Sequence, residues 1–371
     1  YAFEDCTSLT SLEIPSSVTE IGNSAFEGCS SLTSIVIPES VTKIEYGAFD
    51  GCTSLTSVVV EEGNSVYDSR EGCNAIIETA TNKLIQGCNS TIIPSSVTEI
   101  GENAFEGCTS LTSVVIPEGV TKIGKYAFYD CTSLTSIVVE EGNSVYDSRE
   151  GCNAIIETAT NKLIKGSNST IIPSSVTAIG YVAFRGCTSL TSIEIPSSVT
   201  EIGGSTFSGC TSLTSVVIPK GVTAIGNFAF SGCSSLTSIA IPSSVTAIGY
   251  MTFCYCSSLT SIVIPEGVTE IGGGAFADCT SLTSVVIPSS VTEIGKNVFP
   301  GCASLTSIIV EEGNSVYDSR EGCNAIIETV TNTLIDACKS TIIPLSITEI
   351  RRNAFSCTSL TSIEIPSSVK M

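Results

Sequence analysis

Apolar side chains recur along this chain at a fixed interval, which is clearest where each apolar run ends in proline. Six consecutive prolines are spaced 23 residues apart: Pro173, Pro196, Pro219, Pro242, Pro265 and Pro288. The repeated unit reads Ile-Pro-Ser-Ser-Val-Thr-x-Ile-Gly-x-x-Ala-Phe-x-Gly-Cys-Thr-Ser-Leu-Thr-Ser-Ile/Val-x. A period of 23 lies within the range of leucine-rich repeats.

Each apolar position of the unit forms a column through the copies. The leucine column shows twelve rungs, the first of them partial: Leu9, Leu32, Leu55, Leu111, Leu134, Leu190, Leu213, Leu236, Leu259, Leu282, Leu305 and Leu360. A phenylalanine column runs parallel to it and contains every Phe of the chain except Phe228. Columns of this kind predict a core that continues from rung to rung.

The two halves of a rung predict different local structure. Residues 32–38 end in a period-2 alternation, which predicts a short strand with Leu32, Ile35 and Ile37 facing inward and Val36 facing outward. Residues 18–29 carry glycines around a short buried segment, which predicts a turn followed by one helical or 3₁₀ turn.

A single coil of 23 residues cannot bury its own apolar edge, so neighbouring rungs must stack. We therefore predict one leucine-rich-repeat solenoid over residues 1–371, of the α/β class and rich in β-structure. It is a right-handed coil of about 12 rungs with a parallel β-sheet on one face and short helical or 3₁₀ turns on the other.

Three inserts interrupt the repeat at about residues 61–93, 140–172 and 311–343, and each contains nearly the same text. In the first, residues 75–78 and 83–85 flank a short polar turn, which predicts a β-hairpin. The insert is either an enlarged rung with its own small core or a protrusion that contacts a ligand. The residues for the second interpretation are Tyr67, Arg70, Tyr146, Arg149, Tyr317 and Arg320.

Residues 14–34 closely resemble the BspA-type leucine-rich repeat, and the match extends over nearly the whole chain. Inserts like these also resemble ones found in that family. The family is abundant on the surfaces of oral, gut and rumen bacteria and is expanded in some protozoan parasites. The resemblance implies a secreted or cell-surface protein of adhesion or host interaction, and it brings no catalytic residues.

Eighteen cysteines would suit a disulfide scaffold, but their placement argues otherwise. Twelve form one column whose side chains point the same way, which predicts buried free thiols: Cys6, Cys29, Cys52, Cys108, Cys131, Cys187, Cys210, Cys233, Cys256, Cys279, Cys302 and Cys357. The insert pairs Cys73 with Cys88 and Cys323 with Cys338 could instead bridge their hairpins. Since Ser167 replaces the second cysteine in the middle insert, such a bond is not essential there.

The composition narrows the function classes. A net charge of −21 argues against nucleic acid and anionic membranes, which require basic patches. The chain has no His, so it lacks the commonest general base, and we expect no enzyme. The carboxylates of the first insert do not match a calcium loop, and we expect no metal and no cofactor.

The termini and apolar runs bear on location. No apolar run approaches the length of a membrane span. Both ends fall inside a repeat, so we expect a fragment whose export signal and anchor could lie outside it. Asn89 and Asn168 lie in sequons that matter only in a glycosylating host.

The predicted binding surface is the outward column of the sheet, since exposed apolar stripes mark interaction sites. Its members are Val36, Val59, Val115, Val138, Val217, Val263, Val286 and Ile309, interrupted by Ala240 and by Glu13, Glu194 and Glu364. Tyrosines such as Tyr181 and Tyr250 break the repetition on the opposite side. We expect an extracellular or cell-surface module that binds protein or glycan. The alternative is a structural protein that associates with itself in a fibre or coat.

Overall fold

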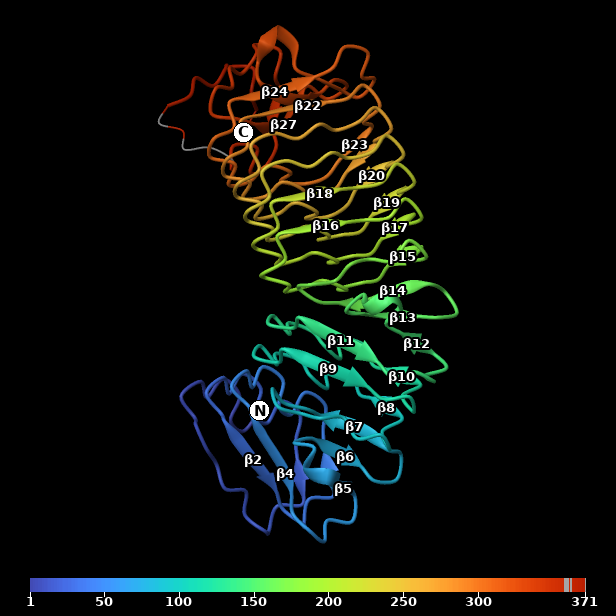
Figure 1. The fold of residues 1–371 in the computed structure, drawn as a ribbon. Coiled ribbons are helices and arrows are strands. Elements are labelled where there is room, and N and C mark those ends of the chain that lie inside the picture. The colour runs from blue at the N-terminus through green and yellow to red at the C-terminus, as the bar shows by residue number, and fades with distance from the viewer. Residues whose placement is uncertain (357–359, 361, 371) are drawn as a thin grey trace. The chain divides into compact units, whose positions relative to one another are not determined.

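The computed structural model describes residues 1–356, 360 and 362–370. It divides into two compact units, Tyr1–Pro173 and Ser174–Met371, called unit 1 and unit 2 below. Each is a β-solenoid of rungs about 23 residues long with parallel sheets, as the sequence predicted (Figure 1). The description of residues 1–371 as one continuous solenoid stays a prediction.

The predicted strands of the rungs form two-stranded parallel sheets, together called the face sheet. Its rungs pair in register, as when Val36 pairs with Val59 and Val115 with Val138. In unit 1 the strands are β2 (Ser34–Ile37), β4 (Ser57–Val60), β9 (Ser113–Ile116) and β11 (Ser136–Val139). In unit 2 they are β16 (Ser192–Glu194), β18 (Ser215–Val217), β22 (Ser284–Ile287) and β24 (Ser307–Val310).

Where the sequence predicted a turn and one helical turn, the structure begins with two-residue strands that pair in parallel in several sheets, together called the side sheet. Unit 1 contains β1 (Glu20–Ile21), β3 (Lys43–Ile44), β8 (Glu99–Ile100) and β10 (Lys122–Ile123). Unit 2 contains β15 (Ala178–Ile179), β17 (Glu201–Ile202), β19 (Ala224–Ile225), β20 (Ala247–Ile248), β21 (Glu270–Ile271), β23 (Glu293–Ile294) and β28 (Glu349–Ile350).

The rest of the rung is a series of turns, and they too bond to the next rung. Phe207 N–H donates to the carbonyl of Ala229 at 2.7 Å, and Gly209 N–H donates to Ser231 at 2.8 Å. We call this third set of inter-rung bonds the turn ladder. Beneath it the phenylalanine rings of unit 2 stack from Phe184 to Phe299, with centroids 5.2 to 5.7 Å apart.

The inserts are built as predicted hairpins that join the side sheet. In the first, β6 (Ile76–Glu78) pairs antiparallel with β7 (Lys83–Gln86), and β7 pairs parallel with β8. It also contains β5 (Tyr67–Asp68) and the 3₁₀ turn η1 (Arg70–Gly72). The corresponding elements of the second are β12 (Tyr146–Asp147), η2 (Arg149–Gly151), β13 (Ala154–Glu157) and β14 (Lys162–Gly166). Those of the third are β25 (Tyr317–Asp318), η3 (Arg320–Gly322), β26 (Ala325–Glu328) and β27 (Thr333–Ala337).

Candidate binding surface

The outward column of the face sheet is longest in unit 2. Register pairs and single bridges join Glu194 to Val217, Val217 to Ala240, and Ala240 to Val263. A bridge between Ser261 and Ser284 continues the stack to β22, where Val286 pairs with Ile309. Five consecutive rungs therefore present an apolar side chain on one line, which we call the stripe.

The middle of the stripe contains a small side chain, Ala240, between two valines. Val217 and Val263 are 72% and 75% exposed, whereas Val286 at the regular end is 42% exposed. The difference arises because Ala240 lies between Val217 and Val263 and leaves the inner side of each uncovered. Unit 1 has only two-rung pieces of the same column, Val36 with Val59 and Val115 with Val138, all of them exposed.

Sequence reasoning missed three exposed apolar residues at the ends of the inserts. Ile92, Ile171 and Ile342 each stand two residues before a proline, as Val36 does, and they are 73 to 77% exposed. The signal was present in the text Thr-Ile-Ile-Pro of each insert. The N–H of Ile92 donates to the carbonyl of Cys73 at 3.1 Å, so this residue is bonded to its own insert.

The threonine hydroxyls beside the stripe donate hydrogen bonds to backbone carbonyls of the preceding rung. Thr214 Oγ1 donates to the carbonyl of Thr191 at 3.1 Å, and Thr306 Oγ1 donates to that of Thr283 at 3.1 Å. Each hydroxyl thus reaches the matching threonine one rung earlier. Because these donors already have an acceptor, the apolar side chains dominate what this face offers a partner.

The insert tyrosines that we considered as ligand contacts lie in the core instead. Tyr67, Tyr146 and Tyr317 are each only 6 to 7% exposed. The Tyr67 hydroxyl accepts a hydrogen bond from the N–H of Ile44 at 3.0 Å, and burial raises the pKa of this phenol. Tyr146 and Tyr317 accept from Ile123 and Ile294 in the same way, each at 3.2 Å. The tyrosines therefore anchor the insert to the preceding side strand.

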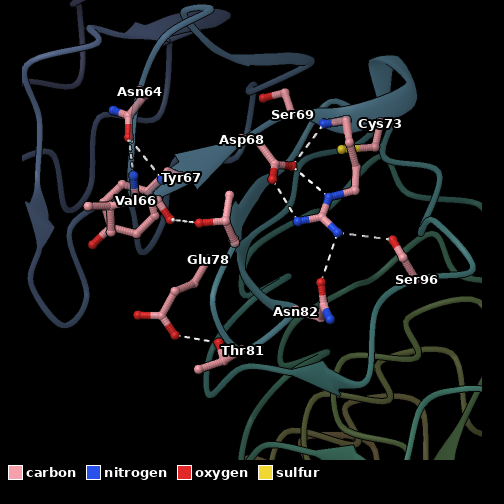
Figure 2. Close-up of polar contacts among 12 residues, drawn as sticks. Asn64, Val66, Tyr67, Asp68, Ser69, Cys73, Glu78, Thr81, Asn82 and Ser96 are labelled. Carbon is pink, nitrogen blue, oxygen red and sulfur yellow. Dashed lines mark hydrogen bonds and ion pairs between the residues drawn. The ribbon is translucent and has the colours of Figure 1, made fainter.

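The insert arginines are also bonded within the insert. Arg70 forms two bonds to the Asp68 carboxylate, at 2.8 and 2.6 Å, and these bonds raise the pKa of the guanidinium. Its third nitrogen donates to Asn82 at 2.8 Å and to Ser96 at 3.3 Å, as the converging dashed lines in Figure 2 show. Arg149 and Arg320 repeat the bonds to their aspartate and asparagine. These contacts favour the enlarged-rung interpretation over a ligand-contacting protrusion.

The column cysteines inside each unit are buried free thiols, except that Cys6 is exposed, contrary to our expectation for it. Cys357 lies outside the described residues. Cys210 donates its thiol to the carbonyl of Phe184 at 3.2 Å, and Cys233 donates to Phe207 at the same distance. Burial raises the pKa of Cys52 and of Cys256 to about 12. These thiols therefore stay neutral and are poor nucleophiles.

The insert cysteines are free thiols in the structure as well. Cys73 and Cys88 pack in different hydrophobic clusters. Cys88 Sγ donates to the carbonyl of Asn74 at 3.3 Å, and in the second insert Ser167 Oγ donates to the matching Asn153 at 3.0 Å. Cys338 makes the same bond to Asn324. A shared hydrogen bond explains why serine can replace cysteine here.

The repeat is also found in known proteins. A family model described as the BspA-type leucine-rich-repeat region matches residues 1–81, 76–152, 155–265, 200–326 and 246–371. The chain belongs to the BspA-type leucine-rich-repeat family. No curated protein matched the sequence.

Solved structures agree with this membership in the BspA-type family. A leucine-rich cell surface protein from Faecalibacterium prausnitzii is 29% identical, with a TM-score of 0.50, over 80% of this chain and 84% of that one. A leucine-rich repeat protein from Eubacterium ventriosum is 24% identical, with a TM-score of 0.55, over 78% of this chain and 81% of that one. The second likeness shows the fold alone.

Two acidic residues of the first insert are bonded to the backbone or to arginine. Glu61 accepts the N–H of Glu39 at 3.1 Å, and Asp68 holds Arg70. Within the described residues, no group of three or more metal-ligating side chains comes together. The same part of the chain contains no helix long and apolar enough to cross a membrane.

Proposed function

We propose that this chain is a non-catalytic binding module, secreted or at the cell surface, that attaches to protein through the stripe. The observation that carries the proposal is the run of five apolar rungs from Val217 to Ile309, joined by parallel strand pairs and single bridges. Exposed apolar surface of this kind usually marks a contact site. The surface location is supported by the Faecalibacterium protein, which is described as a cell surface protein.

The Ala240 notch makes the middle of the stripe the centre of the proposed contact. Binding energy concentrates where a partner side chain enters a recess and loses its water. Val217 and Val263 form the two walls of such a recess. The shorter pieces at Val36, Val59, Val115 and Val138 offer the same chemistry with fewer adjacent rungs, so we expect them to contribute less.

Association with itself is the second candidate. It is favoured by the uniformity of the copies, since a surface adapted to one foreign partner usually varies along one face. The net charge of −21 opposes it, because like-charged copies repel.

Two measurements separate these functions. Light scattering over a concentration series gives the mass, which stays at 38.4 kDa for a monomeric binder and grows for a self-associating protein. Immobilised chain is then tested against purified extracellular-matrix proteins. We expect Val217→Glu with Val263→Glu to weaken binding at least tenfold, while the matched pair Val36→Glu with Val59→Glu changes it much less. Equal loss from both pairs, or no binding by the wild type, contradicts the stripe.

A further inference from the structure

A second surface of unit 2 has features that the stripe does not explain. The turn ladder bonds six rungs through one segment: Val182 N–H to Gly204 O, Ser205 to Asn227, Phe228 to Tyr250, Met251 to Gly273, and Gly274 to Lys296, all at 2.8 to 3.1 Å. The residues directly before these N–H donors, and at the matching position of the last rung, therefore form one column. It contains Tyr181, Gly204, Asn227, Tyr250, Gly273 and Lys296. The order tyrosine, glycine, polar residue occurs twice along it.

Each tyrosine of this column lies over the glycine of the next rung. A Cβ atom on Gly204 would lie 3.2 Å from Tyr181 Cδ2, and one on Gly273 would lie 3.6 Å from Tyr250 Cδ2. The rings are nevertheless 49% and 46% exposed. Each ring is thus supported by backbone while much of it remains open to solvent. The two rings are three rungs apart, about 14 Å at the spacing of paired strands.

The neighbouring column shows that apolar side chains are held on this surface against backbone preference. Its residues all have positive φ, which Gly274, Asn297 and Ser205 adopt with little difficulty. Val182, Phe228 and Met251 adopt it too, at φ of 53°, 58° and 51°, although bulky residues are outliers in this region. Phe228 is the phenylalanine outside the core column, and its ring packs edge-on against Tyr250 with centroids 5.3 Å apart.

We propose that this turn face of unit 2 binds a neutral glycan chain, which stacks sugar rings on Tyr181 and Tyr250. An exposed aromatic ring offers an apolar face to the C–H side of a sugar and a hydroxyl to its rim. Asn227 and Lys296 stand in the same column and supply hydrogen-bond donors between and beyond the rings. The acidic net charge of the chain disfavours sulfated and uronic-acid polymers.

A glycan fits this surface better than a proline-rich peptide does. Such peptides dock in grooves whose walls are aromatic, whereas these rings lie on glycine and are three rungs apart along the solenoid. A linear polysaccharide can run along the rungs and meet successive rings. This site is independent of the stripe, because its residues come from the turn ladder and not from the face sheet.

Calorimetric titration of the chain with cellohexaose, maltohexaose and laminarihexaose tests the proposal. We expect at least one hexasaccharide to bind, and the double variant Tyr181→Ala with Tyr250→Ala to weaken that binding at least tenfold. Tyr255→Ala is the matched control, since Tyr255 is an exposed tyrosine of unit 2 outside the column. Circular dichroism checks that each variant is folded.

Three results overturn the glycan site: no hexasaccharide binds, the double variant binds as well as the wild type, or a decaproline peptide binds in place of the sugars. Stripe variants Val217→Glu with Val263→Glu should leave glycan binding unchanged. Failure of the glycan site and failure of the protein-binding stripe can therefore be told apart.

Discussion

A regular rung and an insert rung fill the interior of the solenoid in different ways. In unit 2 the inner regular rungs place a Phe ring between two others, as Phe253 lies between Phe230 and Phe276. The first insert has no Phe, and the ring of Phe105 fills the space at Gly87, where a Cβ would lie 2.4 Å from its Cε1. Regular rungs thus repeat identical apolar contacts, whereas the insert adds polar contacts such as that of Tyr67 to its own buried apolar residues.

The largest expected effect on stability comes from a substitution in a regular rung. Phe253→Ala removes a fully buried ring between two stacked rings, and we expect a loss of about 3–5 kcal/mol in the free energy of unfolding. Phe228→Ala is the control, because Phe228 is only half-buried and lies outside the stack; a loss below about 1 kcal/mol is expected there. Urea denaturation measures both, and similar losses would contradict the role of the stack.

Among the positions at which the third insert differs from the first, Asp336 replaces the buried Gln86. Asp336 is 3% exposed, and its Oδ2 has no hydrogen-bond partner. Burial raises the pKa of this carboxyl from 3.8 to about 7, against the smaller opposing effects of the Val298 N–H and the Arg351 charge. The folded state therefore holds the proton more tightly than the unfolded state does.

The raised pKa sets the sign of the pH dependence. The contribution of the protonated carboxyl to the free energy of unfolding is complete below about pH 4. It is lost as pH rises through about 7, by about 1.4 kcal/mol per pH unit. We expect Asp336→Asn to be more stable than the wild type at pH 8 by about 3–4 kcal/mol, and the two proteins to be equal at pH 4. A gap that is the same at both values of pH would show that the carboxyl does not titrate this way.

A smaller effect is expected from the insert tyrosines. Tyr67→Phe keeps the buried ring and removes the acceptor of the Ile44 N–H. The free energy of unfolding should fall by about 1–2 kcal/mol, because a donor is left without its partner. Tyr255→Phe changes an exposed hydroxyl and should leave stability unchanged. If Tyr67→Phe is equally neutral, the insert does not depend on this anchor.

The smallest effect is expected at Cys88. Since Ser167 makes the matching bond in the second insert, Cys88→Ser should change stability by less than about 1 kcal/mol. The change also tests the hairpin disulfide, which stays a prediction for an oxidising environment. Mass spectrometry of the unreduced chain counts its free thiols. A bond between Cys73 and Cys88, with a marked loss of stability in Cys88→Ser, would contradict the free-thiol arrangement.

The sequence by itself determined the rung. Its period, its inward columns and the hairpin of each insert follow from alternation and spacing within about 30 residues, so they could be read before the fold was known. The exposed positions of Val217, Val263 and the other stripe residues followed from the same alternation.

Only the tertiary structure decided how each rung meets the next. The side sheet pairs residues 23 apart through strands too short to show a pattern. The turn ladder joins residues 22 apart, as Phe207 joins Ala229. Tyr67 resembled a surface residue because its acceptor role toward Ile44 exists only after stacking. Periodicity reports which way a side chain faces, whereas its partner is set by the stacking of distant segments.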